Sequence, residues 1–139
     1  MLLLDTHVWI WAVDGNARRL GRRARRLLSR AESQDVVRVS TVTLFELTAL
    51  HTLGRVRLTR TPEQWIRESL NVSGVRIAEL TPAIAIDAGA IPRTALADPL
   101  DRLLLATARQ LDAAFLTSDT RILDYASRHG ELHVHNASL

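Results

Sequence analysis

Short segments rich in apolar and β-branched residues alternate with longer segments whose apolar residues recur at helical spacing. The short segments predict strands and the longer ones predict helices. Strands that alternate with helices favour a parallel sheet covered on both faces. We therefore predict a three-layer α/β/α sandwich with a mainly parallel central sheet of four to five strands. The predicted strands are Leu2–Leu4, Val36–Val39, Val75–Leu80, Ala113–Thr117 and, at an edge, Glu131–His135.

Capping signals mark where several helices begin. A polar residue that can accept a hydrogen bond from the first turn precedes each of them, and in three cases a proline follows in the first helical position. No internal repeat or low-complexity linker interrupts the 139 residues, so we expect one domain over residues 1–139. The predicted helix starts are Ser40 or Thr41, Thr61-Pro62, Thr81-Pro82 and Asp98-Pro99.

Composition excludes several classes of protein. The chain has no cysteine, which rules out disulfides and thiolate metal sites. No apolar run approaches the roughly 20 residues that span a bilayer, so we expect no membrane association. Met1–Leu4 lacks the basic segment and cleavage site of a signal peptide. These features predict a cytoplasmic protein.

The basic residues are all arginine, and many of them gather on one predicted helix. The net charge is +3, and the 18 basic residues include no lysine. Genomic bias toward arginine is one explanation for the lack of lysine, and a solvated helix face is one explanation for the cluster. The functional alternative is a basic platform that contacts RNA or an acidic partner, with Arg22 and Arg26 as contact residues. The arginines of this region are Arg18, Arg19, Arg22, Arg23, Arg25, Arg26 and Arg30.

Acidic residues are predicted to meet at one edge of the sheet. Asp5 ends the first strand and Asp119 follows the fourth, so both should emerge at the carboxyl edge, where open parallel sheets bind their ligands. Glu46 lies early in the helix after the second strand. Asp98 and Asp101 begin the helix before the fourth strand, and they reach the same edge if the preceding loop crosses over the sheet.

Each of these acids also has a purely structural explanation, except Glu46. Asp5, Asp98 and Asp119 all stand where a helix N-cap is wanted. Glu46 lies on an apolar helix, where burial is costly without compensation. As a group, the carboxylates would raise one another's pKa, and a bound cation would relieve that repulsion. Oxygen ligands without cysteine favour Mg²⁺ or Mn²⁺ over zinc, and such a site supports hydrolysis of a phosphodiester by a metal-activated water.

Three segments resemble one family along nearly the whole chain. LLLDTHVWIWAVD, STVTLFEL and ADPLDRLLLATARQLDAAFLTSD are similar, in order and spacing, to the PIN-domain ribonucleases, and more closely to the VapC-type toxins of bacterial type II toxin–antitoxin pairs. The resemblance implies a PIN-like fold with an acidic pocket for one or two Mg²⁺ or Mn²⁺ ions. It implies that the catalytic and metal-binding acids are Asp5, Glu46, Asp101 and Asp119, with Asp98 as an additional acid and Thr6 and Thr117 as supporting polar residues.

The resemblance also implies partners. The substrate would be RNA, cut to leave a 3′-hydroxyl and a 5′-phosphate. The chain would form a homodimer and be neutralised by a cognate, VapB-like antitoxin. One departure from the subgroup is Leu96, which stands where a histidine is common two residues before the DPxDR motif.

Other functions are compatible with parts of the pattern. The chain could be a PIN-type nuclease that is not a toxin, or a module that binds RNA or a partner and uses its acids mainly as helix caps. An aspartyl phosphatase with Asp5 as nucleophile would usually carry a second acid two residues later, and His7 occupies that position. We assign no chemistry to Trp9 and Trp11, which are expected to anchor the first helix or a dimer surface.

Overall fold

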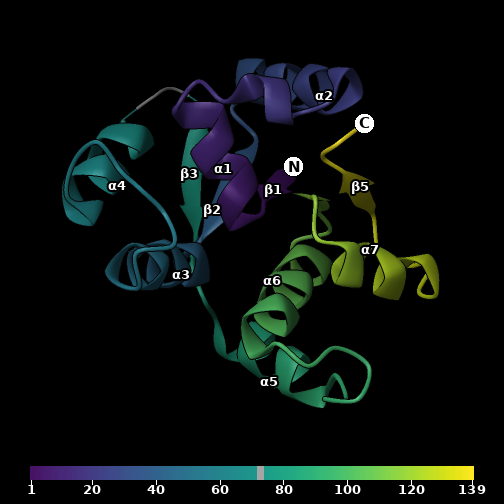
Figure 1. The fold of residues 1–139 in the computed structure, drawn as a ribbon. Coiled ribbons are helices and arrows are strands. Elements are labelled where there is room, and N and C mark those ends of the chain that lie inside the picture. Colours follow the sequence, from purple (N-terminus) through teal and green to yellow (C-terminus); the bar gives the residue numbers. More distant parts are fainter. Residues whose placement is uncertain (72–73) are drawn as a thin grey trace.

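A computed structural model describes residues 1–71 and 74–139. Within these ranges five strands form one sheet in the order β3-β2-β1-β4-β5, and every neighbouring pair is parallel. Figure 1 shows β1 at the centre of the sheet. The predicted α/β class and parallel sheet are confirmed. The strands are β1 (Leu2–Leu4), β2 (Val37–Ser40), β3 (Val75–Ala78), β4 (Ala114–Thr117) and β5 (Val134–Asn136).

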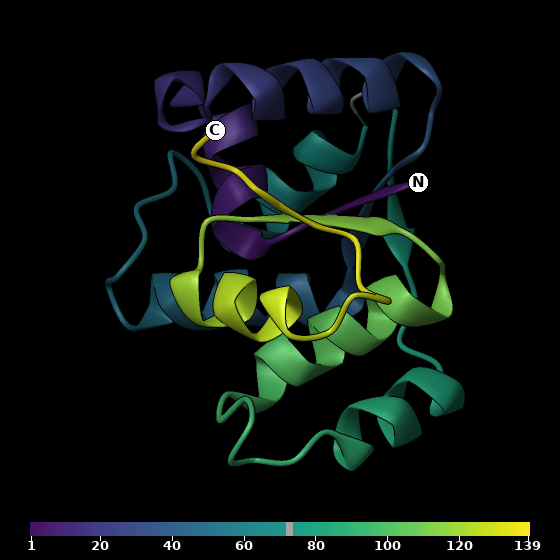
Figure 2. The same ribbon diagram turned by 90° about the vertical axis from the view of Figure 1, so that its right-hand side faces the viewer.

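Helices cover both faces of the sheet, as Figure 2 shows. The helices α1, α2 and α4 pack with one face, whereas α6 and α7 pack with the other and α5 packs on the outside of α6. The helix α3 contributes to the core on both sides. None of the helices in the described ranges is long and apolar enough to cross a membrane. The helices are α1 (Thr6–Val13), α2 (Arg22–Ser33), α3 (Thr41–Thr52), α4 (Pro62–Leu70), α5 (Pro82–Ala90), α6 (Pro99–Gln110) and α7 (Thr120–Ser127).

The central strand β1 has no polar side and is buried on both faces. Leu2 and Leu4 face the α1–α2 layer, and Leu3 faces the α6–α7 layer. Side chains of a strand alternate between faces, so three consecutive leucines fill two cores only when helices cover both. Because β1 is the central strand, its carboxyl end, and therefore Asp5, lies at the middle of one sheet edge.

Four predicted strands have different bounds in the structure: β2 and β4 are shifted or shortened by one residue, whereas β3 and β5 differ by more. The predicted strand Val75–Leu80 ends at Ala78, because its neighbour β2 ends at Ser40 and leaves the following residues without a strand to pair with. The last strand begins at Val134 rather than Glu131. The chain is still leaving α7 at Leu132, whose amide bonds the His129 carbonyl, so pairing with β4 starts later.

Candidate active site

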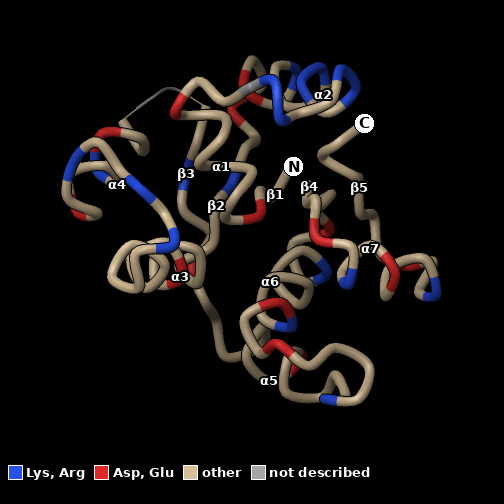
Figure 3. Tube along the Cα trace, viewed as in Figure 1, with Lys and Arg blue, Asp and Glu red and all other residues tan. Residues whose placement is uncertain are grey.

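Five carboxylates converge at the carboxyl edge of the sheet, although they come from distant parts of the chain. The charge of each of the other four acts on Asp101, which places all five in one electrostatic cluster. Figure 3 shows acidic segments around the space between α1, α3, α6 and α7, and basic segments on α2 and the stretch leading into it. We call Asp5, Glu46, Asp98, Asp101 and Asp119 the acidic cluster.

Asp5 is held from two sides by short hydrogen bonds. The Thr6 amide donates to Asp5 Oδ1 at 2.8 Å, which caps α1, and the Thr117 hydroxyl donates to Asp5 Oδ2 at 2.5 Å. Burial nevertheless raises the pKa of Asp5, and it outweighs these two bonds, which lower it. The carboxylate is therefore fixed in position and yet short of compensating positive charge.

Glu46 is half-buried on the turn of α3 that faces α1. Burial raises the pKa of Glu46, the nearby Thr6 hydroxyl partly offsets that effect, and the charge of Asp5 raises it further. The Thr6 hydroxyl also lies 3.4 Å from the hydroxyl of Thr43, which is fully buried one turn before Glu46. Thr6 therefore links the first and second acids of the cluster.

Asp101 feels the charge of every other acid of the cluster. Its side chain is buried in the first turn of α6. Burial and then the charges of Asp98, Asp119, Asp5 and Glu46 together raise the pKa of Asp101 to about 7. A carboxyl with such a pKa is partly protonated near neutral pH unless a positive charge joins it.

Three of the acids cap a helix and also belong to the acidic cluster. Asp5 caps α1, Asp98 caps α6 through the Leu100 amide at 2.9 Å, and Asp119 caps α7 through the Arg121 amide at 2.8 Å. A cap accepts through one carboxylate oxygen, which leaves the other free for a second role. The Thr117 hydroxyl also accepts from the Asp119 amide at 3.0 Å, so one threonine connects the ends of β1 and β4.

Two residues near the acidic cluster were not predicted from the sequence, His7 and Thr43. His7 is exposed in the first turn of α1, and its charge acts on the pKa of both Asp5 and Glu46. A signal existed for both, since each lies within three residues of a predicted acid. Arg22 and Arg26 are exposed on α2, and Figure 3 shows α2 apart from α3, α6 and α7.

The donor set fits a hard divalent cation, although the site is not closed around one. Within the described ranges no three acidic or histidine side chains are arranged closely enough to hold a metal ion as they stand. The cluster nevertheless offers only carboxylate oxygens, with hydroxyls beside them, and the pKa of three of its acids is raised. Excess negative charge on oxygen donors is the condition that a hard divalent cation would relieve.

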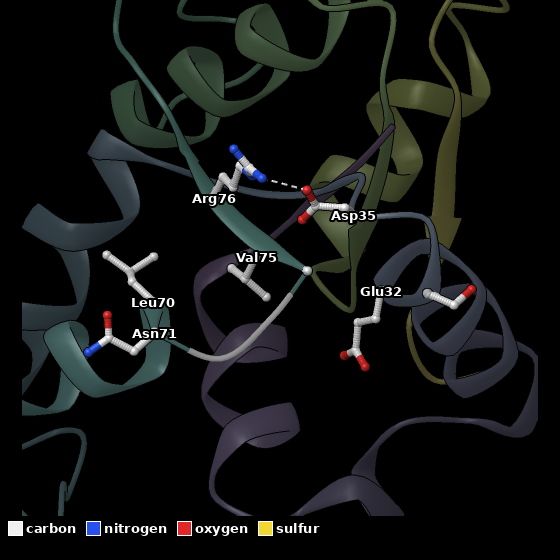
Figure 4. A pocket seen from close by; sticks show the side chains of 8 residues that line it. Glu32, Asp35, Leu70, Asn71, Val75 and Arg76 are labelled. Carbon is white, nitrogen blue, oxygen red and sulfur yellow. Dashed lines mark hydrogen bonds and ion pairs between the residues drawn. The ribbon is translucent and has the colours of Figure 1, made fainter.

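A separate hollow lies at the opposite, amino-terminal edge of the sheet (Figure 4). Its wall includes Arg76, which donates to Asp35 at 2.6 Å. It contains no member of the acidic cluster. The hollow therefore belongs to the junction between α2, α4 and β3 rather than to the candidate active site.

The chain is similar in sequence to known proteins. The PIN domain family model matches residues 2–128. The ribonuclease VapC22 of Mycobacterium tuberculosis is 31% identical over 121 residues, which cover 87% of this chain and 88% of that protein.

Solved structures agree in fold. A chain of the VapBC2 complex from Rickettsia felis, bound to a promoter DNA fragment, has a TM-score of 0.67 at 15% identity and covers 97% of both chains. A chain of the DNA-bound VapBC complex from Salmonella typhimurium has a TM-score of 0.65 at 20% identity, covering 97% of this chain and 96% of the other. With its parallel sheet, its acidic edge and this sequence similarity, the chain belongs to the PIN-domain family, among the VapC-type proteins.

Proposed function

We propose that the protein is a divalent-metal-dependent endoribonuclease and the toxin of a type II toxin–antitoxin pair. The observation that carries the proposal is the convergence of five carboxylates at one sheet edge, with the pKa of Asp5, Glu46 and Asp101 raised. The similarity to a protein named ribonuclease VapC22 supports RNA as the substrate class.

We propose a role for each member of the acidic cluster. Asp5, Asp101 and Asp119 would hold Mg²⁺ or Mn²⁺, with Glu46 and Asp98 as further ligands or as groups that orient a water. When bound, the ion would lower the pKa of a water and neutralise charge on the phosphodiester. The supporting residues are Thr117, which fixes the Asp5 carboxylate, and Thr6, which lies between Asp5 and Glu46.

Cleavage of RNA by the purified protein tests this proposal. We expect cutting of total cellular RNA with Mg²⁺ or Mn²⁺ and none with EDTA. Asp5→Asn and Asp101→Asn should each reduce the rate at least about 100-fold, because each removes a charged ligand. Asp112→Asn is the matched control, since Asp112 is exposed and outside the acidic cluster. Parent-like cutting by either cluster variant would contradict the assigned metal site.

An antitoxin is the proposed protein partner, since solved structures of similar fold are toxin–antitoxin complexes such as that from Klebsiella pneumoniae. We also propose a homodimer. Its support is three exposed apolar side chains, Phe45, Leu53 and Ile86, which are 65%, 67% and 75% exposed. Sedimentation of the parent beside Ile86→Glu tests the dimer. An upstream reading frame for a small DNA-binding protein would support the antitoxin.

A binding module without catalysis is the second candidate, because Asp5, Asp98 and Asp119 all do make helix caps. That function predicts RNA binding that weakens steeply with salt and needs no divalent ion. Catalytic turnover that EDTA abolishes would exclude it as the main function.

Arg22 and Arg26 remain candidates for contact with RNA or antitoxin. Both are exposed, and among the described residues neither forms an ion pair. Reversal of both to glutamate should weaken binding of RNA or of the antitoxin. If both interactions persist, this face of α2 is only solvated.

A further inference from the structure

We propose that His7, Trp11 and Arg19 form an RNA-binding strip that leads away from the acidic cluster and holds the substrate strand beside the cleaved bond. This inference rests on the proposed endoribonuclease function. It adds the path of the RNA strand and identifies Arg19 as the residue that binds its phosphate backbone. We call these three residues the α1 strip.

The strip begins at the acidic cluster. His7 lies two residues after Asp5, in the first turn of α1, and its side chain is exposed. Residues four apart lie on the same side of a helix, so Trp11 stands about 6 Å further along the axis of α1. The two ring centroids are 6.1 Å apart, with the planes inclined by 49°. His7 and Trp11 therefore make one continuous edge.

Arg19 extends this edge from a different segment. It lies in the short 3-10 helix η1 (Ala17–Arg19), which folds back against α1. Its guanidinium carbon lies 5.5 Å from the centroid of the Trp11 ring. An aromatic face at this distance attracts the cation and limits its movement. Arg19 is therefore held against Trp11, at the end of the strip farther from the acidic cluster.

No acid among the described residues neutralises the charge of Arg19. Its side chain is exposed, and none of the ion pairs among the described residues involves it. A guanidinium held by an aromatic ring keeps its N–H donors available, and their planar geometry matches a phosphate. By contrast, Arg109 makes two hydrogen bonds to Asp87 at 2.6 and 3.0 Å and is a structural arginine.

A phosphate backbone needs positive charge on one side of a strongly acidic site. The acidic cluster repels an RNA strand until a cation occupies it, whereas the α1 strip offers an imidazole, an aromatic edge and a guanidinium in succession. Beyond Arg19 the chain enters α2, where Figure 3 shows further arginine segments. The strip thus connects the acidic cluster to the basic side of the molecule.

Part of the Trp11 side chain has an ordinary structural role, since it packs against the core beneath α1. The proposal concerns its remaining, exposed part. Trp11 is a positioning residue, because it acts through Arg19, whereas Arg19 and His7 would touch the RNA. This difference in role is measurable as energetic coupling between Trp11 and Arg19.

Binding of RNA by cleavage-deficient protein tests the strip. The experiment uses a labelled single-stranded RNA that the parent cuts, with Asp101→Asn as the background and Mg²⁺ present. We expect Arg19→Ala to weaken binding about tenfold, as for a charge-assisted contact. It should also reduce the slope of log affinity against log salt by about 0.7, the value for one phosphate of a single strand. Arg30→Ala, which removes the same charge at the far end of α2, should change affinity by less than about twofold.

A double-mutant cycle tests the role of Trp11. Trp11→Leu keeps an apolar side chain. It should weaken RNA binding when Arg19 is present, but it should cause little further loss of affinity in a protein that already carries Arg19→Ala. Trp11→Phe retains an aromatic face and should restore most of the affinity. Thermal unfolding of each variant separates this effect from loss of the fold.

Three results would overturn the strip. Arg19→Ala could bind RNA as tightly as its background, or Arg30→Ala could lose as much as Arg19→Ala. Arg19→Ala could also keep its RNA affinity and lose only binding of an antitoxin, which would assign the surface to the protein partner. A parent protein that neither binds nor cuts RNA would instead refute the proposed function itself.

Discussion

Asp101 shows how a single buried carboxyl can report on the whole cluster. It lies in the first turn of a helix, where an acid is favourable. Its burial and four neighbouring charges all act in the opposite sense and raise its pKa to about 7. An acid whose pKa is raised by folding lowers the stability of the folded chain at pH values where the acid is ionised. The free energy of unfolding should therefore depend on pH.

Between about pH 4, the usual pKa of an aspartate, and about pH 7, the folded chain binds a proton at Asp101 that the unfolded chain has released. This group therefore makes the folded state less stable as pH rises through that window. Asp101→Asn should raise the free energy of unfolding near pH 8 by on the order of 2 kcal/mol and by little near pH 4. Urea unfolding in EDTA at both pH values measures the difference.

Asp112→Asn is the control for that comparison. Asp112 is exposed and has a positive φ of 49°, a conformation that asparagine also adopts. A gain at Asp101→Asn that is equal at both pH values would mean that Asp101 titrates normally.

Thr117 should matter more for activity than for folding. Its buried hydroxyl donates to Asp5 and accepts from the Asp119 amide, so it aligns two acids of the cluster. Thr117→Val keeps the shape and removes both bonds. We expect metal affinity and cleavage to fall about 10- to 100-fold, the usual cost of losing a group that orients a ligand. Titration with Mn²⁺ and initial cleavage rates measure these effects.

Two substitutions make the Thr117 result specific. Thr117→Ser retains the hydroxyl and should keep most of the activity. Thr107→Val removes another buried hydroxyl, which bonds the Leu103 carbonyl at 2.7 Å within α6, and should cost stability without a comparable loss of metal affinity. If Thr107→Val lowers metal affinity as much, the loss at Thr117 is a folding effect.

At the scale of elements, local signals predicted where helices begin better than where strands end. The caps Thr61, Thr81 and Asp98 are all observed, because a cap depends on residues within one turn. The bounds of β3 and β5 depend on how far the neighbouring strand extends, which no local pattern contains. Likewise, Asp5 and Asp119 were found from their place directly after strands, whereas the proximity of Trp11 to Arg19 requires η1 to fold back.

The start of α2 illustrates an element that depends on a distant segment. Gly21 occupies the N-cap without a side chain to accept a bond, and the Leu139 carbonyl accepts from the Ala24 amide at 2.8 Å instead. A Cβ on Gly21 would lie 2.0 Å from the Leu139 carbonyl carbon. Gly21→Ala should therefore displace residues 137–139 and lower the free energy of unfolding by about 1–3 kcal/mol.

Gly89→Ala is the matched control for Gly21. Gly89 lies in α5, and a Cβ there would meet no atom within 4 Å. Alanine should stabilise this helix by about 0.5–1 kcal/mol, because glycine costs more backbone entropy. Chemical denaturation of both variants should give opposite signs. Equal signs would show that Gly21 and Leu139 are not in close contact.

At the scale of the whole molecule, the acidic cluster brings together segments that are far apart in the sequence. Asp5 comes from the end of β1, Glu46 from α3, Asp98 and Asp101 from α6, and Asp119 from the start of α7. Their mutual repulsion acts against the packing of these elements around one edge. A cation that binds there would reverse the sign of this contribution and connect both layers of helices.

Divalent metal should therefore stabilise the fold as well as support cleavage. A ligand present at 100 times its dissociation constant adds about 2.7 kcal/mol if it binds only the folded chain. We expect the melting temperature to rise with Mn²⁺ concentration and to return to its initial value with EDTA. Asp5→Asn should abolish most of the rise, whereas Asp35→Asn, at the opposite edge of the sheet, should retain it. Because melting needs no substrate, an unchanged melting temperature in the parent would count against metal binding at the acidic cluster, whichever RNA the protein cuts.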